Sequence, residues 1–147
     1  AARGGALRLL LLRRGRLGRI LIAMRDSPAA CGTLGLNFDP SHLVWQFIDT
    51  PRAIREFGSH FVHVHAKDER IDYERLHQVG VLGLGWHKPK LPGLGDVNWS
   101  AFFSALSDSG YMGPVCIEVE DRAYERSLAD RKRSLRQSKK FLDQFFG

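Results

Sequence analysis

The 147-residue sequence predicts an α/β fold in which helices cover a parallel sheet. Segments with strand character alternate along the chain with segments that carry helix caps and helical periodicity. Each predicted strand has one apolar face and one face with polar or ionisable side chains. The hydrophobic content of 44% and the charged content of 26% are typical of a folded chain that can bury a core.

The first half of the predicted fold consists of two strands and one helix. Residues 34–38 form a short apolar strand that ends where Pro40 follows. Asp49 and Pro51 supply the cap and the first-turn proline of a helix that runs to a glycine. Residues 61–65 are aromatic, β-branched and histidine residues, and we expect them to form the second strand.

The second half adds further helices and a third strand. We expect a short helix at 72–79, a glycine-rich loop at 80–97 and a helix at 98–110 with apolar residues at helical spacing. Residues 115–119 form the next predicted strand, and 127–146 form a final amphipathic helix.

The basic charge is concentrated at the start of the chain. The formal net charge is +6, but residues 1–25 hold seven arginines and no acidic residue. The other 122 residues hold 15 basic and 16 acidic residues, a net charge of −1. We therefore divide the chain into a basic head, 1–33, and a nearly neutral body, 34–147. The head is either a patch for phosphates or lipid or an uninformative leader, and a nucleic-acid partner is not expected.

Several classes of protein are excluded by composition. Cys31 and Cys116 lie far apart, so we expect neither a disulfide scaffold nor a zinc ribbon, and a cytoplasmic chain with reduced thiols is the default. No apolar run approaches the roughly 20 residues that a membrane-spanning helix requires. A membrane partner is therefore not expected.

The polar faces of the predicted strands indicate where a site would form. They carry Asn37 and Asp39 in the first strand, His63 and His65 in the second, and Cys116, Glu118 and Glu120 in the third. An open parallel sheet covered on both faces would be apolar on both. One polar face in each strand instead favours a closed βα barrel, in which these groups point inward at the catalytic end.

The residue types on these faces favour a metal. The ionisable set comprises Asp39, His42, His63, His65, Lys67, Asp68, Glu118 and Glu120. Carboxylates and imidazoles that converge from different strands suit a divalent ion such as manganese, magnesium, cobalt or zinc. Such an ion would polarise a carbonyl while a carboxylate moves a proton.

Each of these residues also has a structural interpretation. His63 is expected to be a hydrogen-bonded core histidine, and Glu120 to form an ion pair with Arg122 or Lys67. Lys67 and Asp68 together could form only a solvated turn. The same polarity in three strands favours a site over these separate structural roles.

Four motifs in order resemble the sugar phosphate isomerase/epimerase family of xylose isomerase-like TIM barrels. They are DPSH at 39–42, HVHAKD at 63–68, LPGLGDVNW at 91–99 and IEVED at 117–121. The resemblance implies a partial (β/α)8 barrel, with strands six to eight present and the N-terminal half missing. It implies a sugar or sugar phosphate as substrate and a place in carbohydrate metabolism. The same fold also includes apurinic endonucleases of the endonuclease IV type.

The resemblance also assigns roles in the reaction. Asp39, His65 and Glu118 would hold the metal from the sixth, seventh and eighth strands. Glu118 would also act as an acid/base beside the ketose carbonyl.

Three further residues would bind substrate by the same resemblance. His42 would lie behind the ligands or touch substrate, and Lys67 would contact a substrate oxygen. His87, with Trp86, would line the sugar pocket from the glycine-rich loop, which would act as a lid; the alternative for both is an ordinary surface position.

The family pattern includes a fourth ligand, a glutamate from the fifth strand, that this sequence does not supply. The upstream candidate strand, 19–24, is followed by Arg25 and then Asp26, and a guanidinium cannot ligate a cation. A full barrel takes at least about 200 residues. We therefore expect a fragment with weak metal binding and little activity, whose exposed sheet edges could pair in a homo-oligomer. The alternatives are an inactive remnant, an interaction module or an endonuclease IV-like enzyme.

Overall fold

A computed structural model describes residues 35–146 of the chain. The basic head up to residue 34, the predicted strand 19–24 and the pair Arg25 and Asp26 lie outside these residues.

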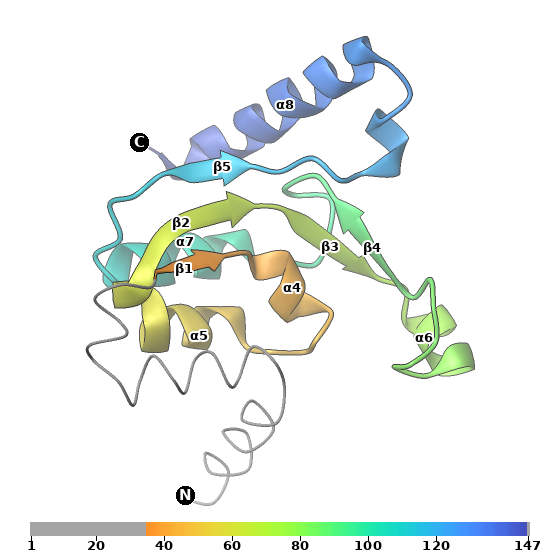
Figure 1. Cartoon of the computed structure of the whole chain (residues 1–147), viewed down its shortest axis with the longest axis horizontal. Coiled ribbons are helices and arrows are strands. Elements are labelled where there is room, and N and C mark those ends of the chain that lie inside the picture. The colour runs from red at the N-terminus through yellow and green to blue at the C-terminus, as the bar shows by residue number, and fades with distance from the viewer. Residues whose placement is uncertain (1–34, 147) are drawn as a thin grey trace, which may run out of the picture. The chain divides into compact units, whose positions relative to one another are not determined.

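A three-stranded sheet is the centre of the described part. Its strands are β1 (Leu36–Phe38), β2 (Phe61–Ala66) and β5 (Val115–Ile117), in the order β1-β2-β5 (Figure 1). β2 and β5 run parallel, with Val64 opposite Val115 and Ala66 opposite Ile117. The predicted α/β class and all three predicted strands are confirmed, and within residues 35–146 the sheet does not close into a barrel.

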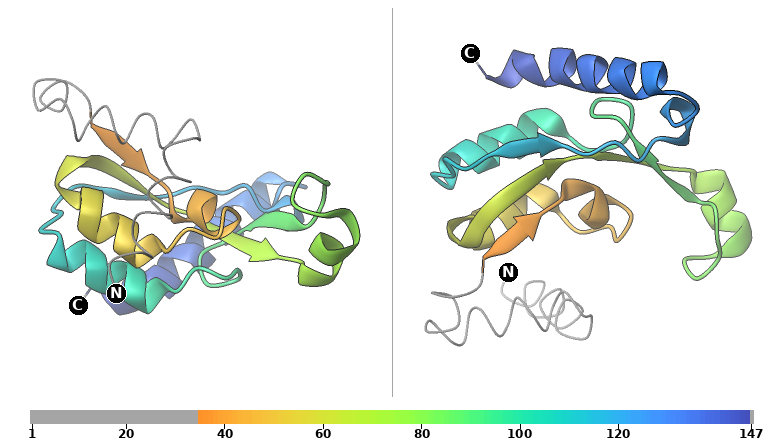
Figure 2. Two further views of the ribbon diagram at one scale, coloured as in Figure 1. Left: turned by 90° about the horizontal axis from the view of Figure 1, so that it is seen from below. Right: turned by 45° about the horizontal axis from the view of Figure 1, so that its top comes forward.

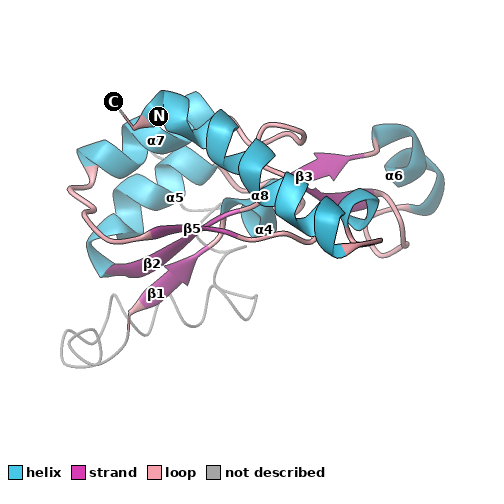
Figure 3. Ribbon diagram, turned by 90° about the horizontal axis from the view of Figure 1, so that it is seen from above, coloured by secondary structure: helices cyan, strands magenta, loops and turns pink. Residues whose placement is uncertain are grey.

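The longer helices begin at side-chain caps, and the predicted cap Asp49 is confirmed. Asp49 accepts a hydrogen bond from the Arg52 backbone N–H at 2.9 Å and begins α5 (Thr50–Phe57). Asn98 caps α7 (Trp99–Asp108), and Ser127 caps α8 (Leu128–Leu142). α5 and α7 contact each other on one face of the sheet, and α8 follows β5 along the chain and contacts it (Figures 2 and 3). Short 3-10 turns span Gly58–His60, Arg122–Tyr124 and Asp143–Phe145.

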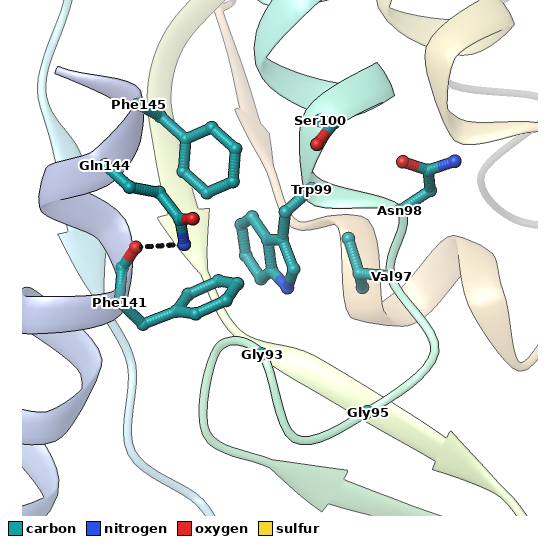
Figure 4. A pocket seen from close by; sticks show the side chains of 9 residues that line it. All are labelled: Gly93, Gly95, Val97, Asn98, Trp99, Ser100, Phe141, Gln144 and Phe145. Atoms are coloured by element: carbon teal, nitrogen blue, oxygen red, sulfur yellow. Dashed lines mark hydrogen bonds between the residues drawn. The ribbon is translucent and has the colours of Figure 1, made fainter. Parts of the chain in front are cut away.

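Aromatic rings fill the space between the sheet and its helices. Phe38 of β1 stacks on Phe61 of β2 with ring centroids 4.4 Å apart, and Phe102 of α7 packs against Phe38. At the first residue of α7, Trp99 meets Phe141 of α8, and together they border a shallow pocket (Figure 4). None of the ionisable residues predicted for the site lines this pocket.

One helix and the two strands of a hairpin were not predicted from the sequence. A short helix, α4 (Pro40–Val44), directly follows β1. The expected loop at 80–97 is wrong in part, because it contains β4 (His87–Lys90), which pairs antiparallel with β3 (Asp68–Ile71). The β3–β4 hairpin continues beyond the end of β2 and carries α6 (Tyr73–Val79) at its far end (Figure 1). The HKPK sequence of β4 has no apolar alternation, so only its pairing with β3 reveals the strand.

The carboxylate of Asp68 connects this hairpin to the rest of the body. Asp68 is fully buried. Its Oδ1 accepts hydrogen bonds from the backbone N–H groups of Glu69 and Val97, both at 2.9 Å. Its Oδ2 accepts from the Gly93 N–H at 2.9 Å and from the Trp99 indole at 2.8 Å. The alternative of a solvated turn at Lys67 and Asp68 is therefore wrong.

No helix within residues 35–146 is long and apolar enough to cross a membrane.

The four hydrogen bonds of Asp68 predict a large effect of an isosteric substitution. Asp68→Asn turns one acceptor oxygen into a donor and leaves two buried N–H groups without partners, which costs about 2–5 kcal/mol of the free energy of unfolding. Urea titration at neutral pH measures this loss. Asp108→Asn, at an exposed carboxyl on α7, is the matched control and should unfold like the wild type. Equal stability of the two variants would contradict the role given to Asp68.

Candidate metal centre

Asp39 stands where β1 ends and α4 begins. Its Oδ1 accepts a hydrogen bond from the Ser41 N–H at 2.9 Å, which caps α4, and Pro40 occupies the first turn. This capping bond fixes the carboxylate, so that Oδ2 is turned toward the ends of β2 and β5. The side chain is 8% exposed. Asp39 thus serves the local structure with one oxygen and the site with the other.

His65 and Glu118 complete the group that the sequence predicts as metal ligands. His65 lies near the end of β2, and Glu118 directly follows β5. Their closest atoms, His65 Nδ1 and Glu118 Oε2, are 2.5 Å apart. One ligand atom from each of Asp39, His65 and Glu118 can be chosen so that all three lie within 4.8 Å of one another. The structure therefore brings together three residues from three strand ends.

The ammonium of Lys67 lies among the surrounding carboxylates. Its Nζ is 2.9 Å from Asp39 Oδ2, 3.3 Å from Glu118 Oε2 and 3.0 Å from Glu120 Oε2. Burial by itself would lower the pKa of Lys67, but the Asp39 and Glu120 carboxylates outweigh burial and raise that pKa. Lys67 is thus a fixed positive charge, and the predicted ion pair between Glu120 and Lys67 is confirmed.

The donor set fits a divalent cation. Asp39 Oδ2 and Glu118 Oε2 are buried and accept no hydrogen bond from the described residues, and ion pairs with Lys67 Nζ and His65 Nδ1 are their polar contacts. Buried oxygens without a hydrogen-bond donor are uncommon in proteins, and a bound ion can satisfy them. Two carboxylates and an imidazole suit manganese, magnesium, cobalt or zinc.

His42 and Trp45 line the approach to Asp39 from α4. His42 Nε2 lies 3.5 Å from Asp39 Oδ2, and its side chain is largely exposed. Trp45, three residues later, points its indole nitrogen at His42 Nδ1, also at 3.5 Å. Helical spacing brings residues three apart to the same side of the helix.

Glu69 is a buried acidic residue near the site that the sequence analysis did not identify. Its Oε1 lies 2.9 Å from Nδ1 of His87, which belongs to β4. Burial raises the pKa of Glu69, and the hydrogen bond to His87 opposes that effect in part. Glu69 follows Lys67 by two residues, so continuing the alternation beyond the predicted strand would have placed it on the same face.

The structure also places three other residues that the sequence analysis discussed, His63, Trp86 and His87. His63 is only half-buried and packs edge-on against His65, so the expectation of a core histidine is wrong. It lies on the polar face, where the ionisable groups gather, rather than under the helices. Trp86 is buried and donates to the Gly83 carbonyl, so the surface position left open for it is wrong, whereas His87 is partly exposed.

Comparisons with known proteins agree with the motifs. A family model described as "Xylose isomerase-like TIM barrel" matches residues 21–145. The Bacillus subtilis protein YfiH is 38% identical over 98 residues, 60% of this chain and 31% of YfiH. An inosose dehydratase of Clostridium perfringens is 29% identical over 89 residues, 58% of this chain and 30% of the dehydratase. A crystal structure of a xylose isomerase domain protein from Planctomyces limnophilus matches with a TM-score of 0.61 and 26% identity, over 76% of this chain and 37% of that one.

The buried carboxyl of Glu69 predicts a pH dependence of stability. The folded chain keeps the Glu69 proton to a higher pH than the unfolded chain, in which a glutamate titrates at roughly pH 4.3. As the pH rises above that value, the unfolded chain binds fewer protons than the folded one, so the free energy of unfolding falls. Glutamine does not titrate, so the free energy of unfolding of Glu69→Gln does not fall with pH for this reason. Its stability relative to the wild type should therefore improve as the pH rises from about 4 to about 7.

Urea titrations at several pH values measure that difference. Glu74→Gln, at an exposed glutamate on α6, serves as the control and should keep a constant difference from the wild type across the range. A constant difference for Glu69→Gln as well would show that burial does not hold a proton on Glu69.

Proposed function

We propose that this chain, which belongs to the xylose isomerase-like TIM barrel family, holds a divalent metal and moves a proton beside the carbonyl of a sugar or sugar phosphate. The observation that carries the proposal is the convergence of Asp39, His65 and Glu118 at the ends of three strands. In this assignment β1, β2 and β5 correspond to strands six, seven and eight of the barrel. Active sites of such barrels form at the carboxyl ends of the strands.

The residues divide the chemistry among themselves. When bound at Asp39, His65 and Glu118, the metal supplies polarisation of the substrate carbonyl. Glu118 takes the proton from the carbon beside that carbonyl and returns it to the same or the neighbouring carbon, as an isomerase or epimerase requires. Lys67, held as a cation, stabilises the negative charge that develops on the substrate oxygen. His42, exposed beside Asp39, is placed to hydrogen-bond a sugar hydroxyl.

A dehydratase is the second candidate, and the name of a relative favours it. The chain resembles an inosose dehydratase, and removal of water next to a ketone also begins with loss of a proton from the adjacent carbon. The same Glu118 would make the carbanion, and the two reactions would differ only in whether a hydroxyl group then leaves. We propose a small carbohydrate in either case, and no nucleic acid.

The chain spans about a third of the length of the relatives it matches, namely 31% of YfiH and 30% of the dehydratase. The candidate strand whose end would carry the family's fourth ligand lies outside the described residues, and the sequence has Arg25 and Asp26 after it in place of a glutamate. With three ligands we expect weak metal binding and low activity, and a chain that binds no metal at all would be an inactive remnant or an interaction module.

Metal binding separates the proposed enzyme from these alternatives. Titration with Mn²⁺, followed by the paramagnetic signal of the free ion, should give about one ion per chain for the wild type. Asp39→Asn and His65→Gln should each weaken binding at least tenfold, because each removes one of three ligands. The controls are Asp108→Asn, at an exposed residue of α7, and His77→Gln, at an exposed residue of α6, and both should bind like the wild type. Unchanged affinity in the ligand variants would contradict the site.

The position of Lys67 predicts an opposite effect. An ammonium 2.9 Å from Asp39 Oδ2 repels a second cation at the same oxygen, so Lys67→Met should bind Mn²⁺ at least tenfold more tightly. The same titration measures this gain. Lys88→Met removes an exposed lysine that pairs with Asp72 and should leave the affinity unchanged. Weaker binding by Lys67→Met would show that Lys67 positions the ligands rather than competing with the ion.

A further inference from the structure

We propose that Glu69 and His87 form a second proton-transfer pair of the site, in which His87 exchanges a proton with an oxygen of the bound sugar and Glu69 positions its ring. The inference rests on the proposed function and deepens it, since it assigns the group that works on oxygen while Glu118 works on carbon.

The two side chains differ in exposure in the way that such a pair requires. The Glu69 side chain is 4% exposed and the His87 side chain is 37% exposed, and Oε1 of the first lies 2.9 Å from Nδ1 of the second. The carboxylate is thus almost closed off from water while the imidazole is open to it. A buried carboxylate is costly unless it is hydrogen-bonded, and its partner here is a histidine. A carboxylate that orients a histidine in this way sets which ring nitrogen faces the substrate.

The His87 ring is fixed on two further sides. Trp45, the residue after α4, stacks on it at 5.1 Å between centroids with planes 14° apart, and Trp86 meets it edge-on at 4.7 Å. With Nδ1 turned to Glu69 and one face covered by Trp45, Nε2 is the ring nitrogen left for a ligand. Ordinary surface histidines are not held by three partners, so the arrangement is that of a preorganised group.

The same contacts place the pair beside the metal centre. Trp45, which covers His87, approaches His42, and His42 in turn lies 3.5 Å from the carboxylate of Asp39. Glu69 lies close enough to Lys67 and Asp39 for their charges to act on it. His87 therefore stands on the hairpin that follows β2, on the side where α4 presents Asp39.

The chemistry balances without any further reagent. His87 enters this step with a proton on each ring nitrogen. As Glu118 takes the proton from carbon, the carbonyl oxygen becomes negative; the Nε2–H bond of His87 breaks and an O–H bond forms, which leaves a neutral enediol. His87 keeps its other proton on Nδ1, hydrogen-bonded to the Glu69 carboxylate. The return step reverses this: a hydroxyl of the enediol gives its proton to Nε2, and Glu118 gives its proton to carbon. A general acid of this kind is worth about 100-fold or more in rate.

Deuterium exchange tests the pair with two variants and two controls on the same hairpin. In D₂O with Mn²⁺, NMR follows deuterium entering D-fructose 6-phosphate and, separately, an inosose. We expect His87→Gln to slow this exchange at least about 100-fold and Glu69→Gln at least about tenfold, with Mn²⁺ affinity unchanged in both. For Glu69→Gln the slower exchange should come from a lower kcat with KM unchanged, and the pH profile of the rate should change.

His77→Gln and Glu74→Gln, exposed on α6, should exchange like the wild type. Exchange at the wild-type rate in His87→Gln would overturn the inference while the metal site stood.

A second readout does not depend on turnover. In the metal-free chain labelled with ¹⁵N-histidine, at a pH where His87 is neutral, its nitrogen shifts should show the remaining proton on Nδ1, and Glu69→Leu should move that proton. Addition of either probe sugar should shift the His87 Nε2 signal and leave that of His77 in place. If the wild type exchanges no deuterium, the proposed reaction fails, and these shifts decide alone: a response at His87 supports the pair, and the absence of any response overturns it.

Discussion

The buried carboxylate of Asp68 is the interaction on which the arrangement of this body depends. Its four N–H donors come from the neighbouring Glu69, from the 93–97 segment and from the first residue of α7. Asp68 connects these segments through its hydrogen bonds, and a buried carboxylate without such donors would be very costly. The chain leaving β2 is thereby directed into β3 instead of into solvent. The residues before and after Asp68, Lys67 and Glu69, are consequently held toward the site.

Charge balance at the metal centre follows from the same segment. Lys67 is the lysine that faces Asp39, Glu118 and Glu120, and its burial among them makes the three carboxylates tolerable. The ammonium of Lys67 offsets the charge of these carboxylates, but two of their oxygens accept no hydrogen bond from residues 35–146. The two oxygens belong to Asp39 and Glu118, two residues of the proposed ligand set.

The sequence was informative where the controlling physics is local. Alternation along a strand is a property of consecutive residues, so the common side of Asp39, His65 and Glu118 could be predicted, as could the cap Asp49. The β3–β4 pairing depends instead on residues about twenty apart, and on contacts such as the Lys90–Asp121 ion pair that link distant segments. No window of the HKPK segment contains that information, and Glu69 was overlooked because its partner His87 lay in an expected loop.

Asp39 shows how local and distant constraints combine in one residue. By capping α4 with Oδ1 it sets the direction of the helix, and the helix spacing then determines where His42 and Trp45 reach. Trp45 meets His87 only because Asp68 has directed the hairpin back along the same side of the sheet. The proposed metal ligand Asp39, the aromatic cover Trp45 and the histidine that it covers therefore depend on two carboxylates, one at the end of β1 and one beyond the end of β2. A change in the direction of either α4 or the hairpin would separate Trp45 from His87 while leaving Asp39, His65 and Glu118 together, so the two halves of the site can fail independently.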